Sequence, residues 1–292
     1  MDRIDVESKK FLGQPKNFVS VFNAFIFDGQ PVLKSQFLKN ENSELVMNVS
    51  KKYADIIKRY EDGTYLDLLV IENQSTVDQA MIARVMEYEG IVRMRYIREK
   101  YDKYVPIGTR TPMVFTIVLY VGESRWTAPR KLSELENIHP GFEEMFDEYH
   151  LNLIELNVNQ KYNTGEKATQ DFFDLLRLVY TKQMDQENQK REFDREAVKL
   201  VYEITKIEAL LKLLEESQGD VKVCEAWNEM MEEARTIGMN KGLKEGIEKG
   251  MEQGASNKER EMYQVMMNNG FSIEKIADIF SVSVESIEKL LS

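Results

Sequence analysis

The feature that most constrains the fold is a pair of strand-like segments joined by a tight turn. Residues 55–60 and 65–72 are rich in apolar side chains, and Glu61-Asp-Gly-Thr64 lies between them. Asp-Gly between two such segments is the strongest short-range signal of a β-hairpin. We therefore expect two adjacent antiparallel strands at this point of the chain.

The segments around the hairpin extend it to an α/β pattern. A helix is expected within residues 1–30, where phenylalanines recur at spacings of three and four, and a short strand is expected at residues 43–50. Residues 77–101 have helical periodicity. Residues 113–121 form a near-continuous apolar run that suits a central strand covered on both faces. With a further strand at residues 151–156, the order predicts an α/β fold with a mixed sheet flanked by helices.

The C-terminal half has a different character. Beyond residue 168 no segment alternates as a strand would, so we expect an all-helical C-terminal region. Within it, residues 238–254 hold a glycine at every fourth position, each of the first four followed by Met or a branched apolar residue. Glycine costs about 1 kcal/mol at each helix position. Such a stripe therefore favours a close helix–helix contact in a homo-oligomer, and a weakly ordered linker is the alternative.

The last segment, residues 261–292, has the rhythm of a small helix-turn-helix module. Ser272 and Ser283 are natural N-caps for its second and third helices. A DNA-reading helix usually begins with Arg, Gln or Asn, but the helix after Ser283 begins with two glutamates and no base. We interpret the module as a packing or association unit, with DNA contact as the alternative.

Composition restricts the setting of the protein. Residues 1–120 carry 17 Lys and Arg against 16 Asp and Glu, a net charge of +1, so the net negative charge of the chain lies in the residues after 120. A neutral N-terminal portion is compatible with a local nucleic-acid surface. No apolar run reaches the roughly 18 residues of a membrane span, the first residues do not resemble a signal peptide, and Cys224 is the only cysteine. We expect a cytoplasmic protein without a membrane partner.

Two polar residues interrupt an apolar strand face at residues 66–74. Side chains of a strand alternate between its faces, so Glu72 and Gln74 continue the face of Leu68 and Val70. Buried without partners, each would cost roughly 1–3 kcal/mol. Solvation at a strand end is one explanation, and a divalent cation is the other. Asp67 has the wrong parity to share a site with Glu72.

Oxygen donors for a cation are available around Glu72. Mg²⁺ prefers carboxylate, carbonyl and water oxygens, which the Glu72 carboxylate and the Asn73 backbone carbonyl provide. Asp55, near the start of the neighbouring hairpin strand about 4.8 Å away, would be the second carboxylate. Aspartate at a strand start is also common turn chemistry, so Asp55 keeps this second interpretation.

The run from Tyr65 through Ile71-Glu-Asn-Gln74 to Tyr88 resembles the signature segment of the recombination-promoting nuclease (Rpn), or transposase-like, family of the PD-(D/E)XK nuclease superfamily. Phe22-Asn-Ala-Phe-Ile-Phe-Asp-Gly29 and Ile117-Val-Leu-Tyr-Val-Gly122 also agree with that family. The resemblance covers roughly residues 10–185 and, more loosely, the glycine-repeat tail.

This resemblance implies a restriction-endonuclease-like domain and a DNA partner. Asp55 and Glu72 take the places of the family's acidic residues, and Gln74 the place where the wider superfamily usually has lysine. The implied activity is Mg²⁺- or Mn²⁺-dependent DNA endonuclease activity of the recombination or mobile-element type, with metal on Asp55, Glu72 and the Asn73 carbonyl, and Gln74 orienting a water. The domains expected are a nuclease-like domain at 1–165, a helical extension at 166–235, the glycine-repeat helix or linker at 236–260 and the module at 261–292.

Two alternatives remain at this stage. Glutamine cannot carry positive charge or deprotonate water, and residues 15–27 lack the further acid that the superfamily often has there. A weak or inactive nuclease fold that acts as a DNA-binding or oligomeric regulatory protein is therefore the alternative function. The arginines Arg84, Arg93, Arg95 and Arg98 either position phosphates or form a solvated helix face with Glu87, Glu89 and Glu99.

Overall fold

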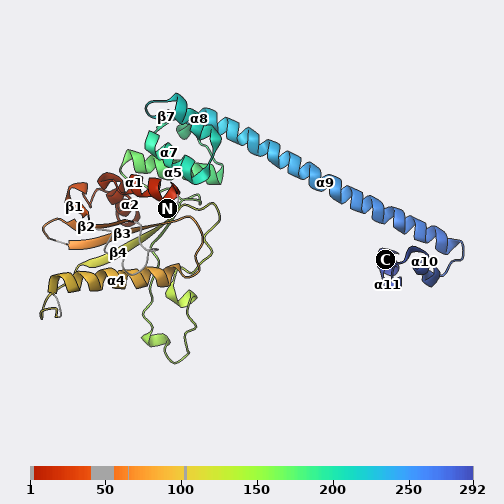
Figure 1. Ribbon diagram of the computed structural model, residues 1–292, viewed down its shortest axis with the longest axis horizontal. Coiled ribbons are helices and arrows are strands. Elements are labelled where there is room, and N and C mark those ends of the chain that lie inside the picture. Colours follow the sequence, from red (N-terminus) through yellow and green to blue (C-terminus); the bar gives the residue numbers. More distant parts are fainter. Residues whose placement is uncertain (1–2, 41–55, 65, 102–103, 292) are drawn as a thin grey trace. The chain divides into compact units, whose positions relative to one another are not determined.

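A computed structural model describes residues 3–40, 56–64, 66–101 and 104–291 (Figure 1). The strand expected at 43–50 and the candidate ligand Asp55 lie outside these described residues.

The core of the fold is a mixed five-stranded sheet in the order β1-β2-β3-β4-β5. The pairs β1/β2 and β2/β3 are antiparallel, whereas β3/β4 and β4/β5 are parallel. The expected hairpin is confirmed, because β2 and β3 pair from Ile56 opposite Ile71 to Glu61 opposite Leu66. The strands are β1 (Leu38–Asn40), β2 (Ile56–Glu61), β3 (Leu66–Gln74), β4 (Met113–Tyr120) and β5 (Leu153–Glu155).

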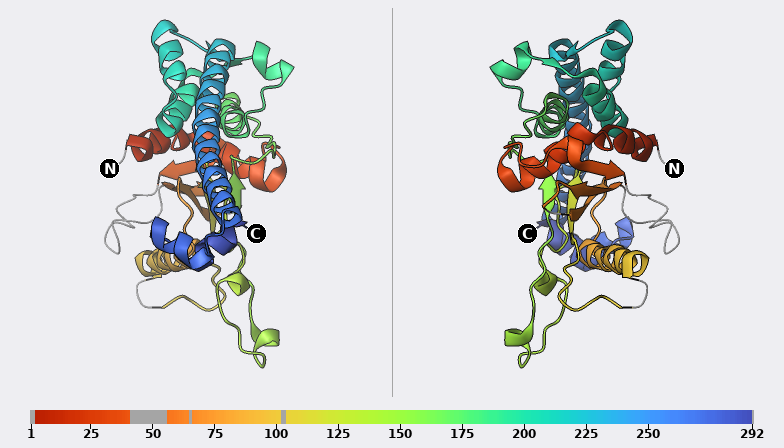
Figure 2. Two further views of the ribbon diagram at one scale, coloured as in Figure 1. Left: turned by 90° about the vertical axis from the view of Figure 1, so that its right-hand side faces the viewer. Right: turned by 90° about the vertical axis from the view of Figure 1, so that its left-hand side faces the viewer.

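Helices cover both faces of this sheet (Figure 1, Figure 2). One face carries α1 (Arg3–Leu12), α2 (Pro15–Phe27), α5 (Lys167–Thr181) and α7 (Arg195–Thr205), and the other carries α4 (Met81–Tyr101). The expected helix within residues 1–30 is thus two helices, and Pro15 opens the second at a position that proline tolerates.

The alternation of β3 divides the apolar interior into two cores. Leu69 and Ile71 belong to the larger core beneath α1, α2 and α5, whereas Leu68 and Val70 belong to a separate core beneath α4. Glu72 follows Val70 on the α4 side. This arrangement confirms the α/β fold with helices on both sides of a mixed sheet.

The C-terminal region is helical, as expected, apart from one pair of two-residue strands. It contains α6 (Gln186–Lys190), α8 (Glu208–Glu216) and the strands β6 (Glu192–Phe193) and β7 (Val221–Lys222). Two residues are too few to show an alternating pattern, so periodicity could not indicate these strands. Three short 3₁₀ helices lie earlier in the described chain, within the α/β part: η1 (Ser35–Phe37), η2 (Leu132–Glu134) and η3 (Glu143–Met145).

The chain divides into two compact units, Met1–Asn228 and Glu229–Ser292. The second unit contains most of α9 (Cys224–Asn268), followed by α10 (Ile273–Phe280) and α11 (Val284–Leu291). A small core joins these helices and is formed by Tyr263, Ile276, Ala277 and Ile287.

The two expected N-caps of this module behave differently. Ser283 caps α11, because its Oγ accepts the backbone N–H of Ser286 at 3.2 Å. Ser272 occupies the N-cap position of α10 but makes no side-chain cap hydrogen bond. No helix in the described part of the chain has an apolar stretch long enough to cross a bilayer.

Candidate nuclease site

The polar end of β3 is built into the sheet rather than exposed at its edge. Glu72 pairs with Val118 and Gln74 with Tyr120 of the parallel neighbour β4. As a result Glu72 is only 4% exposed, whereas Gln74 is partly exposed. A carboxylate this deeply placed needs charged or hydrogen-bonding partners, so Glu72 is not a solvated strand-end residue.

The partner of Glu72 comes from the helix that follows β3. Arg84, in the first turn of α4, places Nη2 3.2 Å from Glu72 Oε1. Its other terminal nitrogen, Nη1, lies 2.5 Å from Asp78 Oδ2. One guanidinium thus bridges a buried carboxylate and a second, more exposed one.

Asp78 is held in place by the entry to α4. Its Oδ1 accepts the backbone N–H of Ala80 at 2.9 Å, as in an Asx turn. Partial burial alone would raise the pKa of Asp78, but the hydrogen bonds from Arg84 and Ala80 and the charge of Arg84 outweigh burial and lower that pKa. Asp78 is therefore an ionised anchor for the Arg84 side chain.

Gln74 turns toward the loop after β3. Its Nε2 donates to the Thr76 carbonyl at 2.6 Å and lies 3.2 Å from Thr76 Oγ1. This orientation leaves the amide at the mouth of the site, two residues beyond Glu72 on the same strand face. An amide there can hydrogen-bond a water or a phosphate oxygen but contributes no charge.

The side chain and the backbone carbonyl of Asn73 point in different directions. Its side chain points to the opposite face, where Nδ2 donates to Ser8 Oγ of α1 at 3.2 Å. The carbonyl of Gln74 accepts the N–H of Val121 at 2.9 Å, on the β4 side. Because successive strand carbonyls point in opposite directions, the Asn73 carbonyl points toward the β2 side.

A second buried polar group lies along α4 below Glu72. Tyr88, Glu89 and Thr116 are each less than 10% exposed. Burial, followed by the negative charge of Glu72, raises the pKa of Tyr88 well above its usual value. Burial also raises the pKa of Glu89, although hydrogen bonds with Thr116 and Tyr149 oppose that rise.

The structure bears on one of the two interpretations that the sequence left open for the arginines of α4, the solvated helix face, and phosphate positioning stays a prediction. Arg95 pairs with Glu99 at 2.8 Å on an exposed helix face, as a solvated arginine would. Arg84 faces the site, and Glu89 is buried rather than solvated. The signal was present in the spacing, because Arg84 lies three residues after buried Met81 and four before buried Tyr88, at the edge of the apolar stripe.

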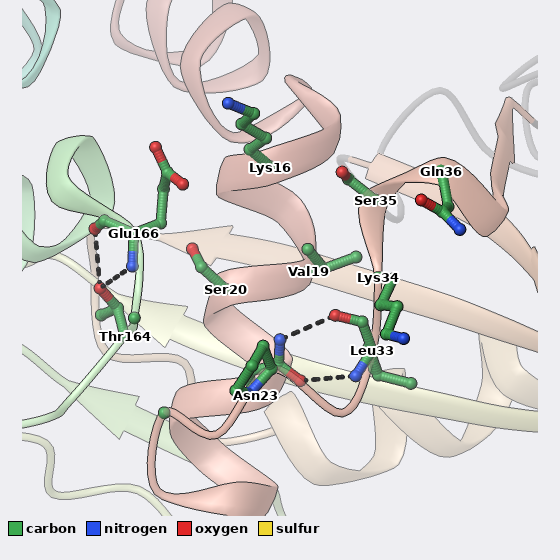
Figure 3. Close-up of a pocket in the computed structure, with 13 residues that line it drawn as sticks. Lys16, Val19, Ser20, Asn23, Leu33, Lys34, Ser35, Gln36, Thr164 and Glu166 are labelled. Carbon is green, nitrogen blue, oxygen red and sulfur yellow. Dashed lines mark hydrogen bonds between the residues drawn. The ribbon is translucent and has the colours of Figure 1, made fainter.

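A cavity of about 250 Å³ lies elsewhere in the same unit (Figure 3). It is lined by α2, the loop before η1 and the start of α5, and its walls include Lys16, Ser20, Asn23, Lys34 and Glu166. The amide of Asn23 closes one wall, since it donates to and accepts from the backbone of Leu33 at 2.9 Å in each direction. The predicted residues Glu72 and Gln74 do not line this cavity.

The donors at the end of β3 suit a hard cation only in part. Within the described residues, no three His, Cys, Asp or Glu side chains gather as a metal cluster. The described residues supply the Glu72 carboxylate and the Asn73 carbonyl, and the guanidinium of Arg84 already contacts that carboxylate. Asp55 directly precedes Ile56, which pairs with Ile71 next to Glu72.

The fold and the strand-end carboxylate place this chain in the class of α/β proteins with a buried acidic site on a central strand. A family model described as putative transposase, YhgA-like, matches residues 8–212. The chain belongs to this family, which corresponds to the Rpn type of PD-(D/E)XK nuclease. Membership implies a nuclease-type enzyme that binds DNA. Comparisons with curated proteins and with solved structures gave no match.

Proposed function

We propose that this protein is a metal-dependent DNA endonuclease of the recombination or mobile-element type. The observation that carries the proposal is Glu72, a carboxylate that is 4% exposed at the end of a central strand, beside a cationic side chain. Burying such a group costs several kcal/mol unless it is compensated. A fold with no use for the charge would be better served by an apolar residue, as at Val70 on the same face.

In this proposal Asp55, Glu72 and the Asn73 carbonyl hold Mg²⁺ or Mn²⁺. The cation would lower the pKa of a bound water and offset negative charge on the phosphate. The oxygen donors fit Mg²⁺, which keeps several waters and binds through one or two carboxylates. A cation on Glu72 would either share the carboxylate with the guanidinium of Arg84 or displace its Nη2.

The remaining roles fall to side chains at the mouth of the site. Gln74 orients the attacking water through its amide. The water oxygen forms a bond to phosphorus, the P–O ester bond breaks, and one water proton goes to the leaving oxygen. The products are a phosphate monoester end and a free hydroxyl end.

The test is nicking of supercoiled plasmid DNA in Mg²⁺ or Mn²⁺, comparing wild type with Glu72→Gln. Glutamine keeps the size of Glu72 but removes the anionic ligand, so we expect cleavage to fall by at least about 10²-fold. Glu99→Gln, an exposed position on α4, is the matched control and should cleave as wild type does. Equal cleavage by Glu72→Gln and wild type would end the assignment.

A second function, DNA binding without efficient cleavage, is favoured by one specific observation. Arg84 occupies one oxygen of the carboxylate that the cation requires, and Gln74 adds no compensating charge. In that case neither wild type nor Glu72→Gln nicks DNA, but both retard it in a gel with a steep dependence on salt.

Self-association through the glycine repeat is the proposed role of α9. Met239, Leu243, Ile247 and Met251 are all more than half exposed on this helix. A second copy packed in antiparallel fashion about Gly246 would bring Lys244 opposite Glu248 and Gly242 opposite Gly250. Light scattering should show a concentration-dependent mass that Ile247→Glu reduces to that of a monomer, whereas Glu259→Gln, outside the repeat, leaves it unchanged.

A further inference from the structure

Hydrolysis of a phosphodiester increases the negative charge on the phosphate, and the residue at the mouth of this site, Gln74, is neutral. We infer that Arg84 is the catalytic cation of the site, binding the scissile phosphate while Asp78 holds its side chain in position. This inference rests on the proposed endonuclease function and selects Arg84 from the four arginines of α4 whose role the sequence left open.

The two terminal nitrogens of Arg84 have separate partners. Nη2 contacts Glu72 at 3.2 Å, and Nη1 contacts Asp78 at 2.5 Å. If a divalent cation takes over the Glu72 carboxylate, Nη2 is released while Nη1 stays on Asp78. The guanidinium then keeps its place but presents an N–H edge, and this planar group is well matched to phosphate oxygens.

The exposed fraction of the side chains rises from Glu72 through Arg84 to Asp78, as expected of a site that substrate reaches from solvent. The side chain of Glu72 is 5% exposed, that of Arg84 23% and that of Asp78 28%. The guanidinium therefore lies between the buried carboxylate and solvent, the direction from which DNA has to arrive.

Two other cations among the described residues, Lys58 and Arg95, are less well placed for this role. Lys58 on β2 pairs with Leu69, so its side chain lies on the opposite face of the sheet, over the ring of Phe18 at 5.6 Å. Arg95 is engaged with Glu99 at 2.8 Å on the exposed face of α4. Arg84, in contrast, contacts the Glu72 carboxylate at 3.2 Å.

The experiment compares four proteins in the plasmid assay with Mg²⁺: wild type, Arg84→Gln, Arg84→Gln combined with Gln74→Lys, and the control Arg95→Gln. Loss of a charge-stabilising donor typically slows cleavage about 10²–10³-fold, which is the expected effect of Arg84→Gln. Lysine at position 74 lies on the Glu72 face of β3 and returns a cation to the site. The double variant should therefore recover at least about tenfold over Arg84→Gln.

Binding of Mn²⁺, measured by titration calorimetry without DNA, separates this role from metal binding. Because Arg84 competes for Glu72, Arg84→Gln should bind Mn²⁺ at least as tightly as wild type, whereas Glu72→Gln should bind it more weakly. Arg95→Gln should match wild type in cleavage and in metal binding.

Each outcome bears on one idea alone. If wild type does not cleave, or Glu72→Gln cleaves equally well, the proposed function fails first. If wild type depends on Glu72 but Arg84→Gln cleaves normally, or a folded Arg84→Gln loses activity that lysine at position 74 does not restore, the role of Arg84 is refuted. If Arg84→Gln does not fold, Asp78→Asn replaces it, because this change leaves Arg84 beside Glu72 but weakens the contact that holds its side chain. Cleavage by Asp78→Asn equal to that of wild type would then refute the role of Arg84.

Discussion

The Arg84–Glu72 pair makes a prediction about stability that does not depend on any activity. In Arg84→Met, the Glu72 carboxylate stays buried without the guanidinium that now lies 3.2 Å away. Breaking a buried ion pair from one side costs about 3–5 kcal/mol. Since the side chain of Arg84 is 23% exposed, solvent screens part of the interaction, and we expect a loss of about 3 kcal/mol in the free energy of unfolding.

The complementary substitution, Glu72→Gln, should lower the free energy of unfolding much less. Glu72→Gln removes the buried charge and leaves an amide that can still accept a hydrogen bond from Arg84, which also keeps Asp78 at 2.5 Å. We expect a loss of about 1 kcal/mol, the usual value for one weakened hydrogen bond. The double variant should lose only about 1–2 kcal/mol, so the coupling energy of the double-mutant cycle is about 2–3 kcal/mol.

Urea denaturation followed by circular dichroism gives all four free energies of unfolding. The matched control is the cycle of Arg95→Met and Glu99→Gln, an exposed pair at 2.8 Å on the same helix, which should couple by about 0.3–0.5 kcal/mol. A coupling energy for Arg84 and Glu72 no larger than that of this control would refute the view that the buried carboxylate depends on Arg84.

Three further predictions concern other parts of the structure. Burial raises the pKa of Glu89 in the folded state, so above about pH 4.3 the folded state binds a proton that the unfolded state has released. The free energy of unfolding of wild type, relative to that of Glu89→Gln, should therefore fall as the pH rises from about 4.3 through the raised pKa. A difference between the two proteins in urea unfolding that does not change with pH would contradict this. Gly165 has φ of +68°, and a Cβ there would lie 2.6 Å from the Gly29 carbonyl oxygen. Gly165→Ala should therefore lower the free energy of unfolding by more than about 1 kcal/mol. Gly63→Ala is the control and should lower it less, because φ is also positive there but the space is open. Ser283→Ala removes the N-cap hydrogen bond of α11. Amide hydrogen exchange in α11 should then be faster, by an amount that corresponds to about 1 kcal/mol in the free energy of opening. Ser272→Ala loses no cap hydrogen bond and should change hydrogen exchange in α10 less.

The sheet could be predicted from the sequence because the patterns that indicate its strands and its hairpin are local. Asp62-Gly63 predicted the hairpin, and the structure places Gly63 at φ of +91° with the Thr64 N–H bonded to Asp62 Oδ1 at 2.9 Å. The apolar run at 113–121 predicted the central strand β4. Alternation along β3 predicted which side chains share a face, and the two separate cores bear this out.

The contact between Arg84 and Glu72 could not be predicted from local sequence patterns. Arg84 lies 12 residues further along the chain, and its contact depends on how the loop after β3 turns the chain into α4. Strand and helix periodicity each describe one element, but neither gives the angle at which the two meet. The burial of Glu89 has the same origin, since it depends on Thr116 and Tyr149 from other elements.

The order of strand, loop and helix explains why the site has this composition. A carboxylate on a central strand has neighbours on both sides and a helix above, so its counter-charge has to come from that helix or from a bound cation. In this chain α4 supplies Arg84, and the loop supplies Asp78 to hold it. The buried acid is therefore compensated within the chain itself. In the proposed mechanism, a guanidinium that lost its contact with Glu72 would remain tethered to Asp78 beside the phosphate. The neutral Gln74 is consistent with such a division of labour, because the positive charge that lysine supplies at that position in the wider superfamily would here come from Arg84.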